Sequence, residues 1–161
     1  MTRPIVTVLA ALVVAFALGA DAQALSSGGS SSSASTGDSA DAAYQEGRKF
    51  VKQNNFKAAI TKLKKAVAAD PKHADAQNLL GYAYRKTGDY DSALVHYNEA
   101  LALDPDHADA HEYIGEAYLE LDDLAKAEEH LVALERICPS GCEQRDELAA
   151  QVAAYKASHG G

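Results

Sequence analysis

The chain has 161 residues, which is room for one ordinary domain and short processing segments. Apolar residues make up 47%, yet there are only 3 Phe and no Trp, so helices packed closely on small side chains are favoured over a bulky aromatic core. The net charge of −8 argues against nucleic acid as a partner, because phosphates require a basic surface.

Residues 1–24 are predicted to form a secretory signal peptide. Arg3 gives a positive start, residues 5–20 are mostly apolar, and small residues allow cleavage after Ala22 or Ala24. The alternative is an uncleaved anchor, but its apolar stretch of 16 residues is shorter than the roughly 20 that span a bilayer. We therefore expect a periplasmic or secreted protein with no stable membrane insertion after cleavage.

Residues 25–39 are rich in Ser, Gly, Ala and Thr. Such a segment cannot bury enough apolar surface to offset the entropy lost on ordering. We expect a disordered linker in front of the folded part.

A 34-residue period dominates the rest of the chain. It appears in four columns: Gly47, Gly81 and Gly115; Ala59, Ala93 and Ala127; Phe50, Tyr84 and Tyr118; and Pro71, Pro105 and Pro139. Apolar positions recur every three or four residues, which predicts two amphipathic helices per unit and a stacked solenoid. Glycine inside a helix costs about 1 kcal/mol, so we expect another helix to press on each one, with the alanine column as the small facing surface.

These columns resemble the tetratricopeptide repeat (TPR) family, whose units carry a Leu-Gly-x-x-Tyr, Ala, aromatic and Pro pattern. The resemblance implies an all-α, TPR-type α-solenoid with repeats at 40–73, 74–107 and 108–141. Three features depart from the pattern. Glu46 replaces Leu in the first unit, the early Trp is missing in all three, where Ala43, Gln77 and His111 stand, and Leu134 replaces the late Ala.

Residues 142–158 predict a capping helix with Leu148, Val152 and Tyr155 on one face. Cys138 and Cys142 flank the turn before it, and two cysteines in one short turn of an exported protein favour a disulfide. A redox-active pair, a metal site and free thiols are the alternatives.

The TPR resemblance also implies a concave groove, lined by the first helix of each unit, that holds a protein or peptide. The candidate binding residues are Tyr44, Arg48, Asn78, Tyr82, Arg85, Glu112, Tyr113 and Glu116. Members that clamp a carboxylate use Lys, Asn and Arg at several of these spots. This chain has Tyr44, Leu79, Asp109 and Tyr113 there, so that clamp is not predicted.

No phosphate loop, catalytic triad or zinc-protease motif is found, so we expect neither an enzyme nor a cofactor. His107 and His111 lie four residues apart, which would also suit a transition metal, although turn and surface roles are the simpler interpretation. A redox or metal-handling accessory is therefore the second functional hypothesis.

The charge is unevenly distributed. The first unit has 8 basic and 3 acidic side chains, the second 2 and 6, and the third 2 and 9. A partner of opposite charge order would be steered onto such a rod, or two copies could associate head to tail as a self-assembling structural solenoid. Solubility alone is the third interpretation.

Overall fold

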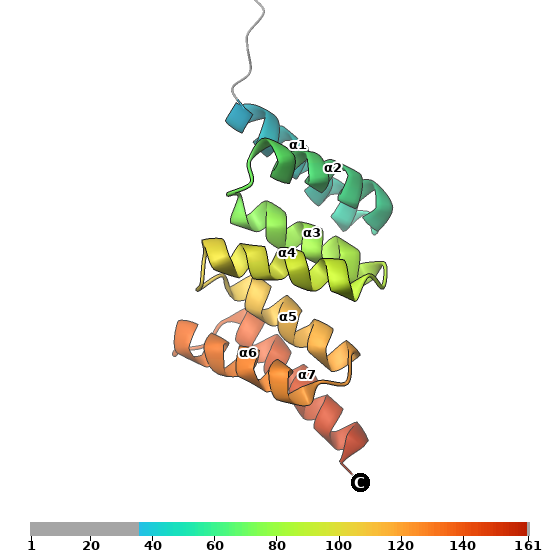
Figure 1. Cartoon of the computed structure of the whole chain (residues 1–161). Helices are drawn as coiled ribbons and strands as arrows, with labels where there is room; N and C mark the ends of the chain where they lie inside the picture. The colour runs from blue at the N-terminus through green and yellow to red at the C-terminus, as the bar shows by residue number, and fades with distance from the viewer. Residues whose placement is uncertain (1–35, 161) are drawn as a thin grey trace, which may run out of the picture. The chain divides into compact units, whose positions relative to one another are not determined.

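The computed structural model describes residues 36–160, which form seven α-helices and contain no β-strand (Figure 1). In chain order they are α1 (Thr36–Lys52), α2 (Phe56–Ala69), α3 (Ala74–Lys86), α4 (Tyr90–Leu103), α5 (Ala108–Glu120), α6 (Leu124–Ile137) and α7 (Glu143–His159). The predicted signal peptide and linker residues 25–35 lie outside the described residues. The prediction that the disordered linker extends to residue 39 is wrong at its end, because α1 already begins at Thr36.

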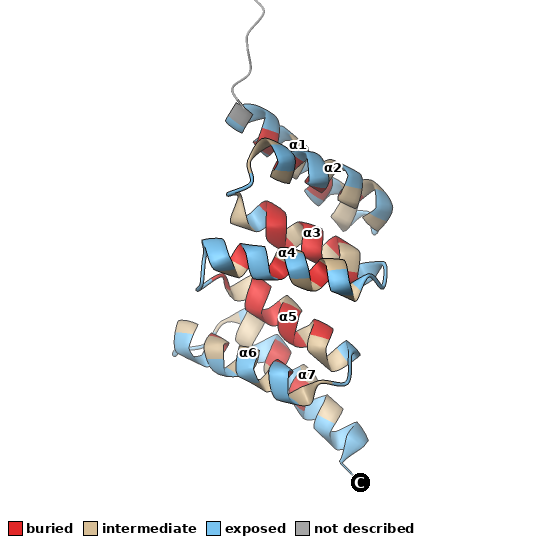
Figure 2. Ribbon diagram, viewed as in Figure 1, coloured by how far each residue is buried: buried red, intermediate tan, exposed pale blue. Residues whose placement is uncertain are grey.

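Six helices form three consecutive pairs, as the repeat predicts. α1 packs on α2, α3 on α4 and α5 on α6, and each pair contacts the next (Figure 1). The buried positions concentrate on α3 and α5, the central first helices (Figure 2). The predicted all-α solenoid is confirmed.

The period also fixes where helices begin. Asn55, Asp89 and Asp123 each accept a hydrogen bond from the backbone N–H three residues later, and so cap the second helix of their unit. His73 and His107 cap α3 and α5 in the same way through Nδ1, at 3.3 Å. The recurring Asp-Pro-x-His turn therefore ends one unit and starts the next.

Close helix contact explains the glycines. A Cβ at Gly81 would lie 2.7 Å from Tyr97 Cδ1 and 3.0 Å from the carbonyl oxygen of Ala93. A Cβ at Gly47 would lie 2.5 Å from Leu63 Cγ. Only hydrogen fits in these spaces. The expectation of a facing alanine column needs correction, because Ala93 contributes its backbone while larger side chains make the nearest contacts.

A polar pair joins the two helices of the second and third units. Gln77 Oε1 lies 2.8 Å from His96 Nδ1, and His111 Nδ1 lies 3.0 Å from His130 Nδ1. Both first members occupy the position where the family carries Trp, so a hydrogen bond between helices stands in place of aromatic packing. A tyrosine of the same unit stacks on each partner histidine, namely Tyr84 on His96 and Tyr118 on His130.

α7 packs on both α5 and α6 and covers the apolar end of the third unit. Leu134, Leu148 and Val152 are at most 3% exposed and belong to one core cluster. A Cβ at Gly115 would lie 2.5 Å from Leu148 Cδ2, so α7 presses on the third glycine. At the other end, exposed Glu46 pairs with Lys62, which explains why Leu is not needed there.

The turn between α6 and α7 brings the cysteines together. The Cα atoms of Cys138 and Cys142 are 5.8 Å apart, and their sulfur atoms are at disulfide distance. The disulfide stays a prediction that this geometry permits. Among the described residues, no helix has the length and apolar character needed to cross a membrane.

Candidate functional site

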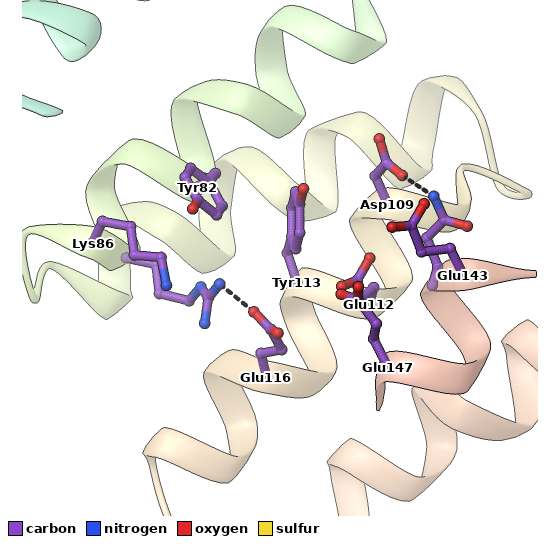
Figure 3. Close-up of a pocket in the computed structure, with 10 residues that line it drawn as sticks. Tyr82, Lys86, Asp109, Glu112, Tyr113, Glu116, Glu143 and Glu147 are labelled. Atoms are coloured by element: carbon purple, nitrogen blue, oxygen red, sulfur yellow. Dashed lines mark hydrogen bonds and ion pairs between the residues drawn. The ribbon is translucent and has the colours of Figure 1, made fainter. Parts of the chain in front are cut away.

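A cavity of about 400 Å³ opens where α3, α5 and α7 meet (Figure 3). Each helix contributes one group of side chains. The lining consists of Tyr82, Arg85 and Lys86 from α3, Asp109, Glu112, Tyr113 and Glu116 from α5, and Glu143, Gln144 and Glu147 from α7.

Helix geometry explains why the α5 residues converge. Glu112 and Tyr113 follow Asp109 by three and four positions, and Glu116 follows them by four and three, so the four residues share one face. In Figure 3 the ring of Tyr113 lies between Lys86 on one side and the carboxyl groups of Glu112, Glu143 and Glu147 on the other. The cavity therefore has a basic side on α3 and an acidic side on α5 and α7.

On the basic side of the cavity, Arg85 of α3 forms ion pairs with two glutamates of α5. Its Nη1 donates to Glu120 Oε1 at 2.8 Å, and its Nη2 pairs with Glu116 Oε2. Arg85 is only 3% exposed and Glu116 is half-buried, so their ion pair between α3 and α5 is largely shielded from water, whereas Glu120 reaches the surface. Arg85 is therefore a structural cation that is already neutralised by the chain.

Tyr82 and Tyr113 form the centre of the cavity. Their ring centroids are 4.9 Å apart, and the Arg85 guanidinium carbon lies 5.5 Å and 5.8 Å from the two ring centroids. Burial, followed by the charges of Asp109 and Glu112, raises the pKa of the Tyr113 hydroxyl above its ordinary value. The rings provide flat contact area with neutral hydroxyl groups.

Glu112 is the most buried carboxyl group of the cavity, with 5% exposure. Burial raises its pKa to about 8, and a hydrogen bond with Glu147 and the charge of Glu116 act in the same direction. Neutral pH therefore favours the protonated form of Glu112, chiefly because its charged form would be buried.

The other carboxyl groups on this side also lack cations. Gln144 donates a hydrogen bond to Asp109 at 2.6 Å. Within residues 36–160, no lysine or arginine forms an ion pair with Asp109, Glu112, Glu143 or Glu147. We call these four residues the carboxyl cluster.

A second cavity, of about 490 Å³, continues from the first along α5 and α7. Glu116 lines both cavities, and Gln151 donates a hydrogen bond to it. Leu119, Ala154 and Tyr155 give the second cavity apolar side chains. The two cavities form one trough with a polar part and a more apolar part.

The structure brings together five of the eight predicted binding residues: Tyr82, Arg85, Glu112, Tyr113 and Glu116. Arg48 instead lines a separate basic depression of α1, and Tyr44 packs against His73 with ring centroids 4.6 Å apart. Asn78 is 4% exposed, and its Oδ1 has no hydrogen-bond partner among residues 36–160.

Sequence reasoning missed five lining residues: Lys86, Asp109, Glu143, Gln144 and Glu147. α7 was interpreted only as a cap. The period itself was the available signal, since Glu143 and Glu147 follow Asp109 and Tyr113 by 34 residues. α7 therefore begins in the register of a fourth first helix and supplies a groove wall.

The histidine pair has structural partners. His107 Nε2 lies 3.1 Å from Asp75 Oδ1, and His111 Nε2 lies 3.1 Å from the Pro105 carbonyl oxygen. In the part of the chain that the structure describes, no group of three or more His, Cys, Asp or Glu side chains is arranged to hold a metal ion. The metal hypothesis receives no support from this geometry.

Two family models match overlapping parts of the chain. A TPR repeat model matches residues 81–122, and a tetratricopeptide repeat model matches residues 44–95. No curated protein matches the sequence.

Solved structures share the fold at low identity. The first TPR domain of Spaghetti (RPAP3), bound to an HSP90 peptide, is 24% identical with a TM-score of 0.67, and the alignment covers 75% of this chain and 95% of that one. The Yersinia enterocolitica type III secretion translocator chaperone SycD is 18% identical with a TM-score of 0.68, covering 75% and 86%. The TPR domain of Arabidopsis OM64 is 12% identical with a TM-score of 0.68, covering 74% and 98%.

Proposed function

We propose that this chain binds a protein or peptide in the trough between α3, α5 and α7. Its residues 44–122 match models of tetratricopeptide repeats, whose proteins are typically interaction modules rather than enzymes. The observation that carries the proposal is the open cavity of about 400 Å³. Two tyrosine rings, two basic side chains and five carboxyl groups line it. The RPAP3 domain with its HSP90 peptide supports the idea that this helix arrangement can hold a peptide.

The test begins with cross-linking in the native host and mass spectrometry to name the partner. Binding of the purified partner is then compared for the native chain, Tyr113→Ala and the control Val132→Ser, which changes a side chain that is 63% exposed on α6. We expect Tyr113→Ala to weaken binding at least about tenfold, because buried aromatic anchors dominate binding energy. Unchanged binding of a variant that keeps its helical circular dichroism would exclude this trough as the site.

Export is a further part of the proposal, and it is supported by the pattern of residues 1–24. N-terminal sequencing of the protein from its host should find a chain that begins at Gln23 or Leu25, in the periplasm or the medium. A chain that retains Met1 in the cytosol would contradict export and leave the interaction proposal standing.

A further inference from the structure

The trough carries an excess of negative charge that the chain does not balance. Arg85 is committed to Glu116 and Glu120, whereas the carboxyl cluster has no lysine or arginine partner among residues 36–160. Within the cluster Glu112 is buried and Asp109 half-buried, whereas Glu143 and Glu147 are exposed. The charged form of a buried carboxyl group is unfavourable without a counter-charge. A cation entering the cavity would supply one.

Glu112 indicates where in the cavity a cation would bind. Its side chain is more than nine-tenths buried and lines the cavity, and it shares a hydrogen bond with the acidic Glu147. In Figure 3, Glu112 and Glu147 face each other beside the ring of Tyr113. An ammonium or guanidinium group placed there would meet carboxylates on one side and an aromatic face on the other.

A buried polar atom without a partner lies on α3, outside the residues that line the cavity. Asn78 occupies the repeat position that Glu112 occupies in α5, one helical turn before Tyr82. Its buried Oδ1 accepts no hydrogen bond from any residue that the structure describes. A peptide N–H is the kind of donor that such an amide oxygen can accept.

We infer that the occupant of the trough is an extended peptide segment of another protein, whose lysine or arginine side chain enters the carboxyl cluster beside Tyr113. This inference rests on the proposed function and names the partner's chemistry. The apolar second cavity, which shares Glu116, would receive a neighbouring apolar side chain.

The dimensions limit the length of the segment. From Asp109 to Glu120 the axis of α5 rises roughly 16 Å. An extended chain advances about 3.3 Å per residue, so about five residues would cover both cavities. The chain's own linker cannot supply the cation, because residues 25–39 contain no lysine or arginine.

Cation binding should expel the proton of Glu112. The titratable groups that line the cavity with Glu112 are Asp109, Tyr113 and Glu116 from α5, Glu143 and Glu147 from α7, and Tyr82, Arg85 and Lys86 from α3. Since the carboxyl groups outnumber the two basic side chains, a bound ammonium group would favour the ionised form of Glu112. Affinity for a lysine peptide should therefore rise with pH from 6 to 9, where lysine itself stays charged.

The test uses the full chain and three blocked pentapeptides: acetyl-Ala-Ala-Lys-Ala-Leu-amide and its norleucine and glutamate counterparts. Binding is followed by amide chemical shifts at pH 6 and pH 9. We expect the lysine peptide to shift the signals of Glu112, Tyr113 and Glu147, and to bind about tenfold more tightly than the norleucine peptide.

The double variant Glu112→Gln/Glu147→Gln should weaken the lysine peptide at least about fivefold and abolish its pH dependence. The matched control Glu129→Gln/Glu135→Gln removes the same charge from exposed positions of α6 and should change affinity less than about twofold. Equal losses in both variants would show that only bulk charge attracts the peptide, and would overturn the site.

Norleucine or glutamate peptides that bind in the trough as tightly as the lysine peptide would overturn the cation inference while the proposed function stands. A native chain that dimerises in sedimentation, and becomes monomeric in Glu112→Gln/Glu147→Gln but not in the control, would identify a second copy as the occupant instead. Loss of partner capture by Tyr113→Ala is judged separately and bears on the proposed function alone.

Discussion

His130 Nδ1 donates its proton to His111 Nδ1 across 3.0 Å, and this bond joins α5 to α6. The direction follows from the other end of His111, where Nε2 lies 3.1 Å from the Pro105 carbonyl oxygen and must be the donor. A neutral His111 then has a lone pair on Nδ1. A further proton on His111 would set two N–H groups against each other.

Acid should therefore weaken the third unit. Burial, followed by the charge of His111, lowers the pKa of His130 from 6.5 to about 4. Between these values the unfolded chain binds a proton that the folded chain does not, so the free energy of unfolding falls as the pH falls through this window. Urea unfolding at pH 7.5, 6 and 4.5 measures the drop.

His130→Gln keeps an N–H donor and removes the titration, so its unfolding free energy should depend less on pH. His159→Gln, near the exposed end of α7, serves as the matched control and should follow the native curve. A native-like slope in His130→Gln would contradict the assignment.

Glu112 should act in the opposite direction. Its pKa is raised from 4.5 to about 8, so between these values the folded chain holds a proton that the unfolded chain has lost. Stability from this group is complete below pH 4.5 and is lost as the pH rises towards 8. Glu112→Gln should therefore raise the melting temperature at pH 8 much more than at pH 4.5. The control Glu129→Gln should leave the melting temperature nearly unchanged at both pH values.

The Arg85 ion pairs should be costly to break. Arg85→Leu leaves Glu116 and Glu120 without their cation, and we expect a loss of about 3 kcal/mol in unfolding free energy, as for other buried pairs. Arg136→Leu breaks an ion pair to Asp106 whose side chains are 62% and 63% exposed, so it should cost less than about 1 kcal/mol. Similar small losses in both variants would show that the Arg85 pairs are solvated.

Gly81→Ala tests whether packing or helix propensity decides at the glycine column. Propensity alone predicts a gain of about 1 kcal/mol. The new Cβ would meet the Tyr97 ring and the Ala93 backbone, so we expect a net loss of about 1–3 kcal/mol instead, measured by urea unfolding. A stabilised variant would mean that α3 and α4 separate easily.

The cysteines can be tested by mass. We expect no alkylation of the exported native protein until a reductant is added, and then two alkylated thiols. Cys138→Ser/Cys142→Ser should lose on the order of 1–2 kcal/mol, because the cross-linked loop is short. Full alkylation without reductant would contradict the disulfide.

The periodic features of the fold were predictable from the sequence. Gly47, Gly81 and Gly115 fixed the register because helix contact tolerates no side chain at those positions. The helix-starting residues Asn55, Asp89 and Asp123 follow the same period. These properties depend on local geometry that repeats with the sequence.

The site was only partly predictable, because its properties depend on neighbours. Tyr82 and Tyr113 were identified through the repeat position, but the burial of Arg85 depends on Glu116 and Glu120 from the next unit. Arg48 was predicted as a groove residue only because it occupies an equivalent repeat position, and the structure places it in a separate depression. The wall supplied by Glu143 and Glu147 was missed because α7 lacks the glycine and proline that mark the other units.

Solenoids fray from their ends, and α7 is the terminal helix here. It is also the helix that completes the trough, through Glu143 and Glu147. Opening of the last helix and loss of binding competence are therefore one local event. A bound ligand would slow amide hydrogen exchange along α7. The exchange rate of this terminal helix would therefore report whether the trough is occupied, without any change of shape elsewhere.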